Sequence, residues 1–314
     1  MTLLRSLLKR ISLGLVATWG VLTVLFGLFA LTDNWVLEAE VGLLKWGGAS
    51  EEAVREARQE YFSARGLDRP VTEQYVGWIT DMFTLQWGES WVSNEPVISM
   101  VAETTTRTAM YVIPAFVIAV TAGVFVGVYV ALHPESRLAN TGRMASYLVF
   151  ALPGFWVGGM LLSFPLGGLF GYEDLFFDHL LPIALTAATL LGGYVSYARA
   201  HSLEYATTDF VRLVEAKGAG PLRVARHVVR NAAIPLFSML FTEILGLLVL
   251  TVFVIEVLFG IDGFGRLLFD AVDQRDLPVL LGGTMVIIAV GVGGNVLQDV
   301  AYSVFDPRVD TGSR

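Results

Sequence analysis

Six long apolar runs constrain the fold of this chain more than any other feature of its sequence. Five lack Asp, Glu, Lys, Arg and His, and the sixth, residues 232–255, has only Glu243; the five are residues 11–31, 109–132, 144–170, 180–198 and 277–298. A helix crosses the roughly 30 Å hydrocarbon core of a bilayer in about 20 residues. Backbone polar groups in lipid must pair internally, and no period-two alternation indicates a barrel. The sequence therefore predicts an all-α, polytopic membrane protein with six transmembrane helices.

The composition and the N-terminal segment agree with this interpretation. Only 16% of the residues are charged, whereas soluble domains have about 25%. Arg5, Lys9 and Arg10 precede the first run, as in a signal peptide. The run of residues 11–31 is longer than the roughly 7–15 apolar residues of a cleaved signal, so we expect an uncleaved first span. There is no cysteine, which excludes disulfides and thiolate metal sites.

The charges of the connecting segments alternate along the chain. Residues 32–106 hold five Lys and Arg against thirteen carboxylates, whereas residues 199–231 hold six against three. Residues 171–179 have three carboxylates and no Lys or Arg. Because cations in short loops prefer the cytoplasmic side, we expect both termini and residues 199–231 in the cytoplasm. Residues 32–106 are then extracellular.

The segment after the first span is expected to form a small helical subdomain. Ser50 is placed to cap a helix that stops at Gly66, and Thr72 is placed to cap another. We therefore predict three parts: residues 1–107, the first transmembrane helix with the extracellular subdomain; residues 108–305, a transmembrane domain of five helices; and residues 306–314, a cytoplasmic tail.

The most basic stretch of the chain, residues 199–231, has start and stop signals typical of two short helices. Thr208 or Asp209 can cap a helix that runs through Lys217, Gly218 can take the left-handed stop, and Pro221 can open the next helix. Basic inner loops also hold topology and contact anionic headgroups. Topology alone does not require capped helices or a glycine turn. These features therefore indicate a second interpretation, in which the segment is a rigid projection that meets a cytosolic partner.

Four stretches of the chain resemble one protein family. RLVEAKGAG followed by RHVVRNAAIP resembles the cytoplasmic coupling loop of ABC importer permeases (MetI-like), in particular the B-type subunit of dipeptide and oligopeptide importers. GLDRPVTEQYVGWITDMFTLQWGESW is similar to the extracellular segment of that subunit. VIEVLFGIDGFGRLL is similar to its loop after the fifth span, and VFDPRV to its tail. These stretches are spread along the chain, so the resemblance extends over nearly its whole length.

The resemblance implies a permease subunit that moves peptides inward and performs no chemistry itself. Its implied partners are a second homologous permease, two cytosolic ATPase subunits and an extracellular solute-binding protein. A coupling helix between the fourth and fifth spans would dock in the ATPase, with these contact residues: Asp209, Phe210, Val211, Arg212, Glu215, Ala216, Lys217 and Gly218. The wider importer consensus places Glu-Ala-Ala six residues ahead of the glycine, where this chain has Arg212-Leu213-Val214. Glu215 is therefore not equated with that consensus glutamate.

Motifs for other chemistry are missing from the sequence. No GxxxxGK[ST] loop, HExxH or nucleophile turn occurs, and the four histidines are scattered, so we expect no enzyme activity, cofactor or metal. Glu243 and Glu256 are carboxylates within or at the edge of the fifth span, where such groups are costly. Glu243 would line a pathway or pair within the bundle, and Glu256 would gate or anchor a loop. The alternatives are an ABC importer of nickel chelates or sugars, and an ion-coupled secondary transporter.

Overall fold

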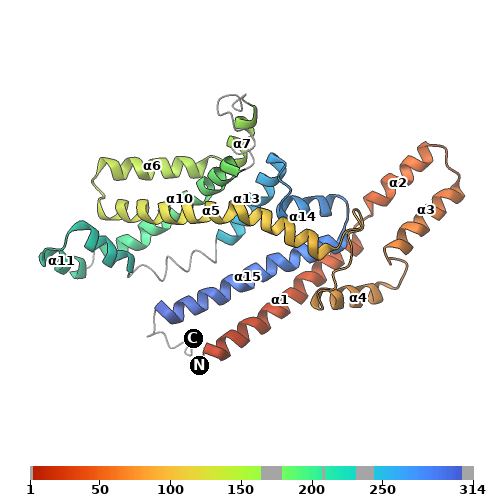
Figure 1. Ribbon diagram of the computed structural model, residues 1–314, viewed down its shortest axis with the longest axis horizontal. Helices are drawn as coiled ribbons and strands as arrows, with labels where there is room; N and C mark the ends of the chain where they lie inside the picture. The colour runs from red at the N-terminus through yellow and green to blue at the C-terminus, as the bar shows by residue number, and fades with distance from the viewer. Residues whose placement is uncertain (1–2, 164–178, 207–208, 231–243, 306–314) are drawn as a thin grey trace. The chain divides into compact units, whose positions relative to one another are not determined.

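The computed structural model describes residues 3–163, 179–206, 209–230 and 244–305. Helices make up nearly all of these residues (Figure 1), and the one β-feature among them is an isolated bridge between Glu89 and Pro96. The helices are α1 (Leu3–Leu31), α2 (Trp35–Trp46), α3 (Glu51–Ala64), α4 (Val71–Phe83), α5 (Val97–Leu132), α6 (Arg137–Ala151), α7 (Gly154–Ser163), α10 (Leu181–Ala206), α11 (Asp209–Ala216), α13 (Ile244–Phe259), α14 (Phe264–Asp273) and α15 (Leu277–Phe305). Residues 221–230 are also helical. The prediction of a helical protein is confirmed.

The described residues contain four helical segments long and apolar enough to cross a membrane: residues 8–46, 97–132, 181–206 and 277–298. The pair α6 and α7 makes a fifth if the two helices form one bent span. The sixth predicted run begins in residues 231–243, which lie outside the described residues. A multi-pass membrane protein is thus confirmed, and the count of six remains a prediction.

The third predicted run is not one straight helix. The sequence predicts a span over residues 144–170, but α6 ends at Ala151 and α7 starts at Gly154, with a bend of 78° between them. Leu152 takes the extended conformation that a residue before proline prefers, with φ −88° and ψ 118°. Pro153 supplies no N–H to continue the helix, which explains the break.

The chain divides into two compact units, and the first comprises residues 1–7, 106–266 and 293–314. Its helices α5 and α10 pack through glycine. A Cβ atom on Gly127 would lie 2.8 Å from the Val195 carbonyl oxygen and 2.6 Å from the Ala198 Cβ. A Cβ on Gly192 would lie 3.0 Å from the Ser146 carbonyl oxygen of α6. Small residues allow such backbone approach, which is how helices associate in lipid.

A second cluster in this unit joins three helices at the other end of α10. Tyr111 of α5, Leu185 of α10 and Ile255 of α13 are buried against one another. Val157 and Leu161 of α7 pack on the same cluster, so α7 is held although it leaves the direction of α6. In lipid, such a cluster stabilises the contact of the helices through van der Waals packing.

The second unit comprises residues 8–105 and 267–292. Its core joins α1 to α15 and to α4: Leu22 and Phe26 are buried with Leu277, Leu281 and Met82. Aromatic rings extend this core, and Phe26 meets Trp78 edge to face at 5.2 Å between ring centroids. Figure 1 shows α2, α3 and α4 as the helices that follow α1 in this unit.

The helices α2 and α3 form a hairpin with its own core of Leu37, Val41, Val54 and Tyr61. The predicted cap is confirmed, because the Ser50 side chain accepts a hydrogen bond from the Ala53 N–H. The buried residues of the two helices pack on one another, and Leu67, after the end of α3, is partly buried against them.

The predictions for the ends of the next two helices differ in outcome. Gly66 adopts φ +62°, as expected of a stop after α3. The prediction that Thr72 caps α4 was wrong, since the helix starts at Val71 with Pro70 before it and no side-chain cap. The Pro70 carbonyl accepts from the N–H groups of Glu73 and Gln74, so Thr72 already lies within the first turn.

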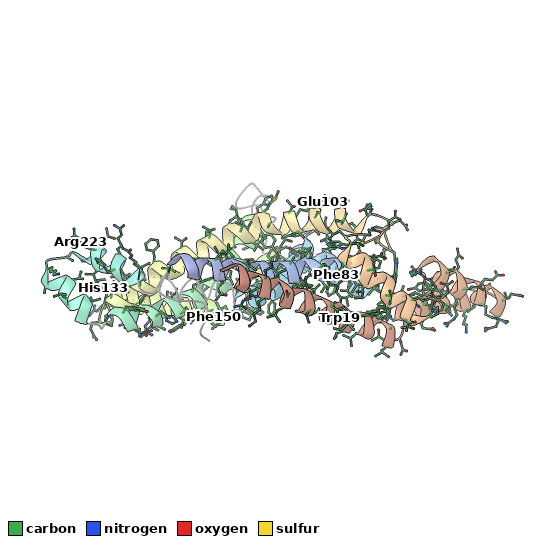
Figure 2. The ribbon with its side chains drawn as sticks, turned by 90° about the horizontal axis from the view of Figure 1, so that it is seen from below. Trp19, Phe83, Glu103, His133, Phe150 and Arg223 are labelled. Carbon is green, nitrogen blue, oxygen red and sulfur yellow. The ribbon has the colours of Figure 1, made fainter. Side chains whose placement is uncertain are left out.

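Large apolar side chains project outward from both units. Trp19 on α1 is 51% exposed and Phe150 on α6 is 54% exposed (Figure 2). Apolar surface of this extent is rare on soluble monomers and is expected where lipid surrounds the helices. The exposed rings thus agree with the span assignments made from hydropathy.

Candidate functional site

The predicted helix–turn–helix of the basic segment is present in the structure. Helix α11 covers Asp209–Ala216, so it ends one residue before the predicted Lys217. Gly218 adopts φ +78°, which confirms the expected left-handed stop. The Ala219 N–H then donates to the Val214 carbonyl at 3.3 Å, and this closes the turn.

The second helix of this hairpin begins at Pro221, as predicted. The N–H groups of Arg223 and Val224 donate to the Gly220 carbonyl at 2.9 and 3.2 Å. Val224 and Val228 are four residues apart, so they share one face, and both are buried against Val211 of α11. We call residues 209–230 the basic hairpin.

The basic hairpin is seated on the ends of two long helices of its unit. Leu132, the last residue of α5, packs on its valine cluster, as do Tyr205 and Ala206 at the end of α10. The basic hairpin is therefore in contact with the ends of both α5 and α10.

Two leucines of the basic hairpin that were not among the predicted contact residues are exposed. Leu213 is 53% exposed and Leu222 is 86% exposed. A signal for Leu213 was available: it lies two residues after Val211, roughly 200° around the helix, so both cannot face the same core. Lys217, Gly218 and Arg223 are exposed as well, and Arg223 projects from the hairpin in Figure 2. The surface thus combines apolar and cationic groups.

For the other predicted contact residues, the structure describes some side chains and only the backbone of others. Val211 is buried within the hairpin, whereas Ala216 is exposed at the end of α11. Four more belong to the backbone of α11, with side chains outside the described part of the chain: Asp209, Phe210, Arg212 and Glu215. Thr208 and Glu243 lie outside the described residues altogether.

A second candidate residue, Glu256 of α13, is fully buried. Its Oε1 atom accepts hydrogen bonds from the Thr108 hydroxyl and, at 3.0 Å, from the Tyr111 hydroxyl, both on α5. Its Oε2 atom accepts from the Arg266 N–H at 3.0 Å. Thr108 in turn accepts from the Phe264 N–H at 2.8 Å. The carboxyl group thus joins α5, α13 and the start of α14.

The loop after α13 needs its glycines in order to reach Glu256. A Cβ atom on Gly265 would lie 2.9 Å from the Phe253 Cα and 3.1 Å from Glu256 Oε2, and one on Gly263 would overlap the Glu256 carboxyl. The Arg266 guanidinium closes the loop by donating to the Gly260 carbonyl at 2.8 Å. The glycine-rich GIDGFG stretch therefore serves close backbone approach.

Arg275 and Asp276, between α14 and α15, were not recognised from the sequence. The Arg275 guanidinium donates to the carbonyls of Phe29, Thr32 and Asp33, at 2.8, 3.3 and 2.6 Å, and so closes the C-terminal end of α1. Burial lowers the pKa of Arg275, and interactions with Tyr61 and Asp33 oppose this shift. In the sequence, Arg275 and Asp276 are only an Arg-Asp pair before an apolar run. Such a pair also occurs in ordinary loops, so it did not indicate their role.

Asp276 ties the same loop to the segment before α5. Its carboxylate accepts hydrogen bonds from the Ser90 hydroxyl and, at 3.2 Å, from the Trp91 N–H. The Val279 N–H lies 3.5 Å from the same carboxylate, so Asp276 also serves the first turn of α15. Together with Arg275 it fixes the joint between α1, residues 84–96 and α15 within the second unit.

No group of three or more His, Asp or Glu side chains suited to a metal ion occurs in the part of the chain that the structure describes. The candidate sites are thus the basic hairpin and the Glu256 network.

Comparison with known proteins gives one family and a set of full-length relatives. Residues 123–311 match the family described as binding-protein-dependent transport system inner membrane component. A protein of Brucella ovis that carries the name of a peptide permease is 32% identical, covering 98% of this chain and 99% of its own length. The oligopeptide transport system permease protein AppB of Bacillus subtilis is 28% identical over 81% of this chain and 85% of its own. A peptide transport system permease protein of Brucella abortus is 31% identical over 85% and 88%.

Proposed function

Because the chain belongs to the family of inner membrane components of binding-protein-dependent transport systems, we propose that it is the permease subunit of an ATP-driven peptide importer. The names of its relatives support peptides as the cargo. No observation in the described residues favours a nickel chelate, a sugar or ion coupling. The subunit would form the pathway with a homologous permease and would leave ATP hydrolysis to two cytosolic partners.

The observation that carries this proposal is the exposed face of the basic hairpin. Leu213 and Leu222 offer apolar area, and the exposed Lys217 and Arg223 of the same hairpin offer charge. An interface needs such an apolar centre with a polar rim. Gly218 fixes the angle between the two helices, so the face is presented without further ordering. We propose this face as the one that meets the ATPase subunit.

The residues proposed for this contact keep the set expected from the family resemblance, with the two leucines added. They are Asp209, Phe210, Val211, Arg212, Leu213, Glu215, Ala216, Lys217, Gly218 and Leu222. Val211 acts from within the hairpin, since it is buried. Both termini and the hairpin would then lie in the cytoplasm, and residues 32–106 would lie outside, where the solute-binding protein arrives.

Glu256 is proposed as a residue that anchors a loop, because its carboxyl group is buried and accepts three hydrogen bonds from α5 and the start of α14. A residue that lines a pathway would present its polar atoms to the cargo, and those of Glu256 are engaged. For Glu243 we keep both roles that the sequence allows, lining the pathway or pairing within the bundle.

Uptake by the reconstituted transporter tests the proposed function. The complete complex in liposomes, with its solute-binding protein outside, should accumulate a labelled tripeptide only when ATP is enclosed. An ionophore that collapses proton and sodium gradients should leave the initial rate unchanged. Uptake without the binding protein, driven by an ion gradient in liposomes that hold this chain alone, would overturn the proposal.

A further inference from the structure

A recess walled by tryptophan rings lies in the unit formed by residues 8–105 and 267–292. It has a volume of about 170 Å³ and opens between α4, residues 86–91 and the start of α15. Its main walls and its polar groups are Trp78, Trp87, Trp91, Asp81, Gln86 and Glu89. Neither the basic hairpin nor the Glu256 network belongs to it.

The aromatic walls are fixed by contacts within the unit. The rings of Trp78 and Trp91 lie 5.7 Å apart, centroid to centroid, with their planes tilted by 53°. The Trp87 indole N–H donates to the Met82 carbonyl at 3.2 Å, and Asp276 holds the Trp91 backbone. Buried Met82 and Leu281 line the recess behind these rings. The recess is therefore preformed.

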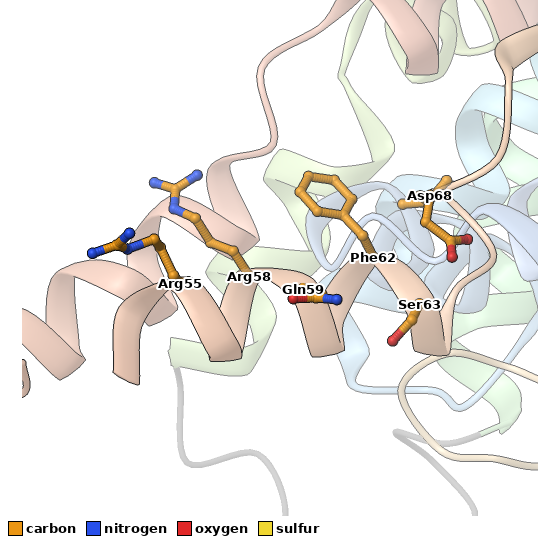
Figure 3. A pocket seen from close by; sticks show the side chains of 7 residues that line it. Arg55, Arg58, Gln59, Phe62, Ser63 and Asp68 are labelled. Atoms are coloured by element: carbon orange, nitrogen blue, oxygen red, sulfur yellow. The ribbon is translucent and has the colours of Figure 1, made fainter. Parts of the chain in front are cut away.

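The carboxyl groups of the recess have no cationic partner among the residues that the structure describes. Asp81 is half-buried and Glu89 is exposed. A larger hollow on α3 differs in its lining, because it includes the cations Arg55 and Arg58 (Figure 3). There Arg58 pairs with Glu38 at 2.9 Å, and the Arg55 side chain donates to the Glu51 carbonyl. In the recess, by contrast, the charges of Asp81 and Glu89 are both negative, and no described cation forms a salt bridge with either of them.

Aromatic faces beside carboxylates are the surroundings that a cation prefers, since the ring quadrupole attracts positive charge. A volume of about 170 Å³ is below the roughly 300–1,000 Å³ of small-molecule pockets. The recess therefore suits the end of one side chain better than a whole peptide. Residues 32–106, which contain most of it, carry five Lys and Arg against thirteen carboxylates, so their field favours a basic partner.

We propose that the recess receives a lysine or arginine side chain of the solute-binding protein when that protein docks on the transporter. This inference depends on the proposed function, because it needs the binding protein as a partner. The Trp rings would cover the stem and the face of the cation, and Asp81 and Glu89 would neutralise its charge. The contact would add both affinity and register to docking.

Binding of the solute-binding protein to the complete transporter in nanodiscs tests the inference. Asp81→Asn with Glu89→Gln removes both carboxylates at nearly constant shape and should weaken binding about tenfold. The matched control is Glu52→Gln with Glu56→Gln, two exposed residues of α3 that change the net charge equally. The control should shift affinity less than about twofold, because charges at a distance are screened by salt. Glu89→Gln alone, at an exposed position, should weaken binding in the same direction.

The outcomes separate this inference from the proposed function. If the unaltered transporter does not bind the solute-binding protein, the proposed function fails. If it binds and the recess variant binds equally well, or if both double variants lose affinity alike, only the inference fails. A loss confined to the peptide-loaded binding protein would assign the recess to the peptide and would also overturn the inference.

Discussion

At the scale of single residues, Glu256 shows what a sequence can and cannot indicate. A carboxylate beside an apolar run is conspicuous, because its burial is costly unless it is bonded. Its partners Thr108 and Tyr111 precede it by 148 and 145 residues, and their residue types are common in any membrane helix. The sequence therefore predicted that Glu256 matters, and only the packing of α5 on α13 reveals what it bonds.

Glu256→Gln should lower the melting temperature of the detergent-solubilised protein by several degrees. The amide keeps one acceptor oxygen and turns an NH₂ group toward donors, and a buried donor left unpaired costs about 1–3 kcal/mol. Glu135→Gln, an exposed isosteric change before α6, should have no measurable effect. Equal melting temperatures, with peptide uptake altered only in Glu256→Gln, would contradict the anchoring role.

At the scale of elements, local turn chemistry was readable and packing was not. Gly218, Pro221 and Ser50 were placed correctly, because each position depends on the conformational preference of one residue. Thr72 was placed wrongly, because α4 already starts at Val71 and Pro70 takes the cap position two residues before Thr72. The bend at Pro153 could be suspected from the sequence, but its 78° angle is set by the contacts of α7 with α10 and α13.

The Gly218→Val variant should still insert and assemble, but it should fail to stimulate ATP hydrolysis by its partner subunits. Valine at φ +78° strains the backbone by about 1–2 kcal/mol or more, so the face with Leu213 and Leu222 changes its angle. Gly220→Val is the matched control, since Gly220 lacks a left-handed φ and has open space around it.

The measurement for this pair is ATPase stimulation by the peptide-loaded binding protein in nanodiscs. Stimulation should fall at least severalfold in Gly218→Val and persist in Gly220→Val. Full transport by a double variant, Gly218→Val with Arg212→Ala, would show that the basic hairpin only holds topology.

At the scale of the whole molecule, the charge pattern predicts sidedness, and hydropathy predicts most of the spans. Four described helical segments qualify as spans by length and composition, and a bent pair makes a possible fifth. The hydropathy of a span is summed over many residues, so a few atypical residues do not change the prediction. Hydropathy could not indicate that residues 267–292 join residues 8–105 in one unit, because that grouping depends on tertiary contacts.

Single cysteines test the sidedness without background, because the natural chain contains none. Glu56→Cys on α3 should react with a membrane-impermeant maleimide in intact cells. Leu222→Cys, on the basic hairpin, should react only in inverted membrane vesicles. Both positions are exposed, so burial does not protect either of them. Labelling of both from the same side would contradict the predicted topology.

The glycine contacts between α5 and α10 have a mechanical consequence. At Gly127 there is no side chain to rotate or compress, and the Val195 carbonyl oxygen is closer than a side chain would allow, since a Cβ atom there would lie only 2.8 Å from it. This close backbone packing disfavours sliding of one helix along the other. The valine cluster of the basic hairpin packs on Leu132 and Tyr205, near the ends of α5 and α10. If the basic hairpin meets the ATPase subunit as proposed, a force applied there would reach both helices at once.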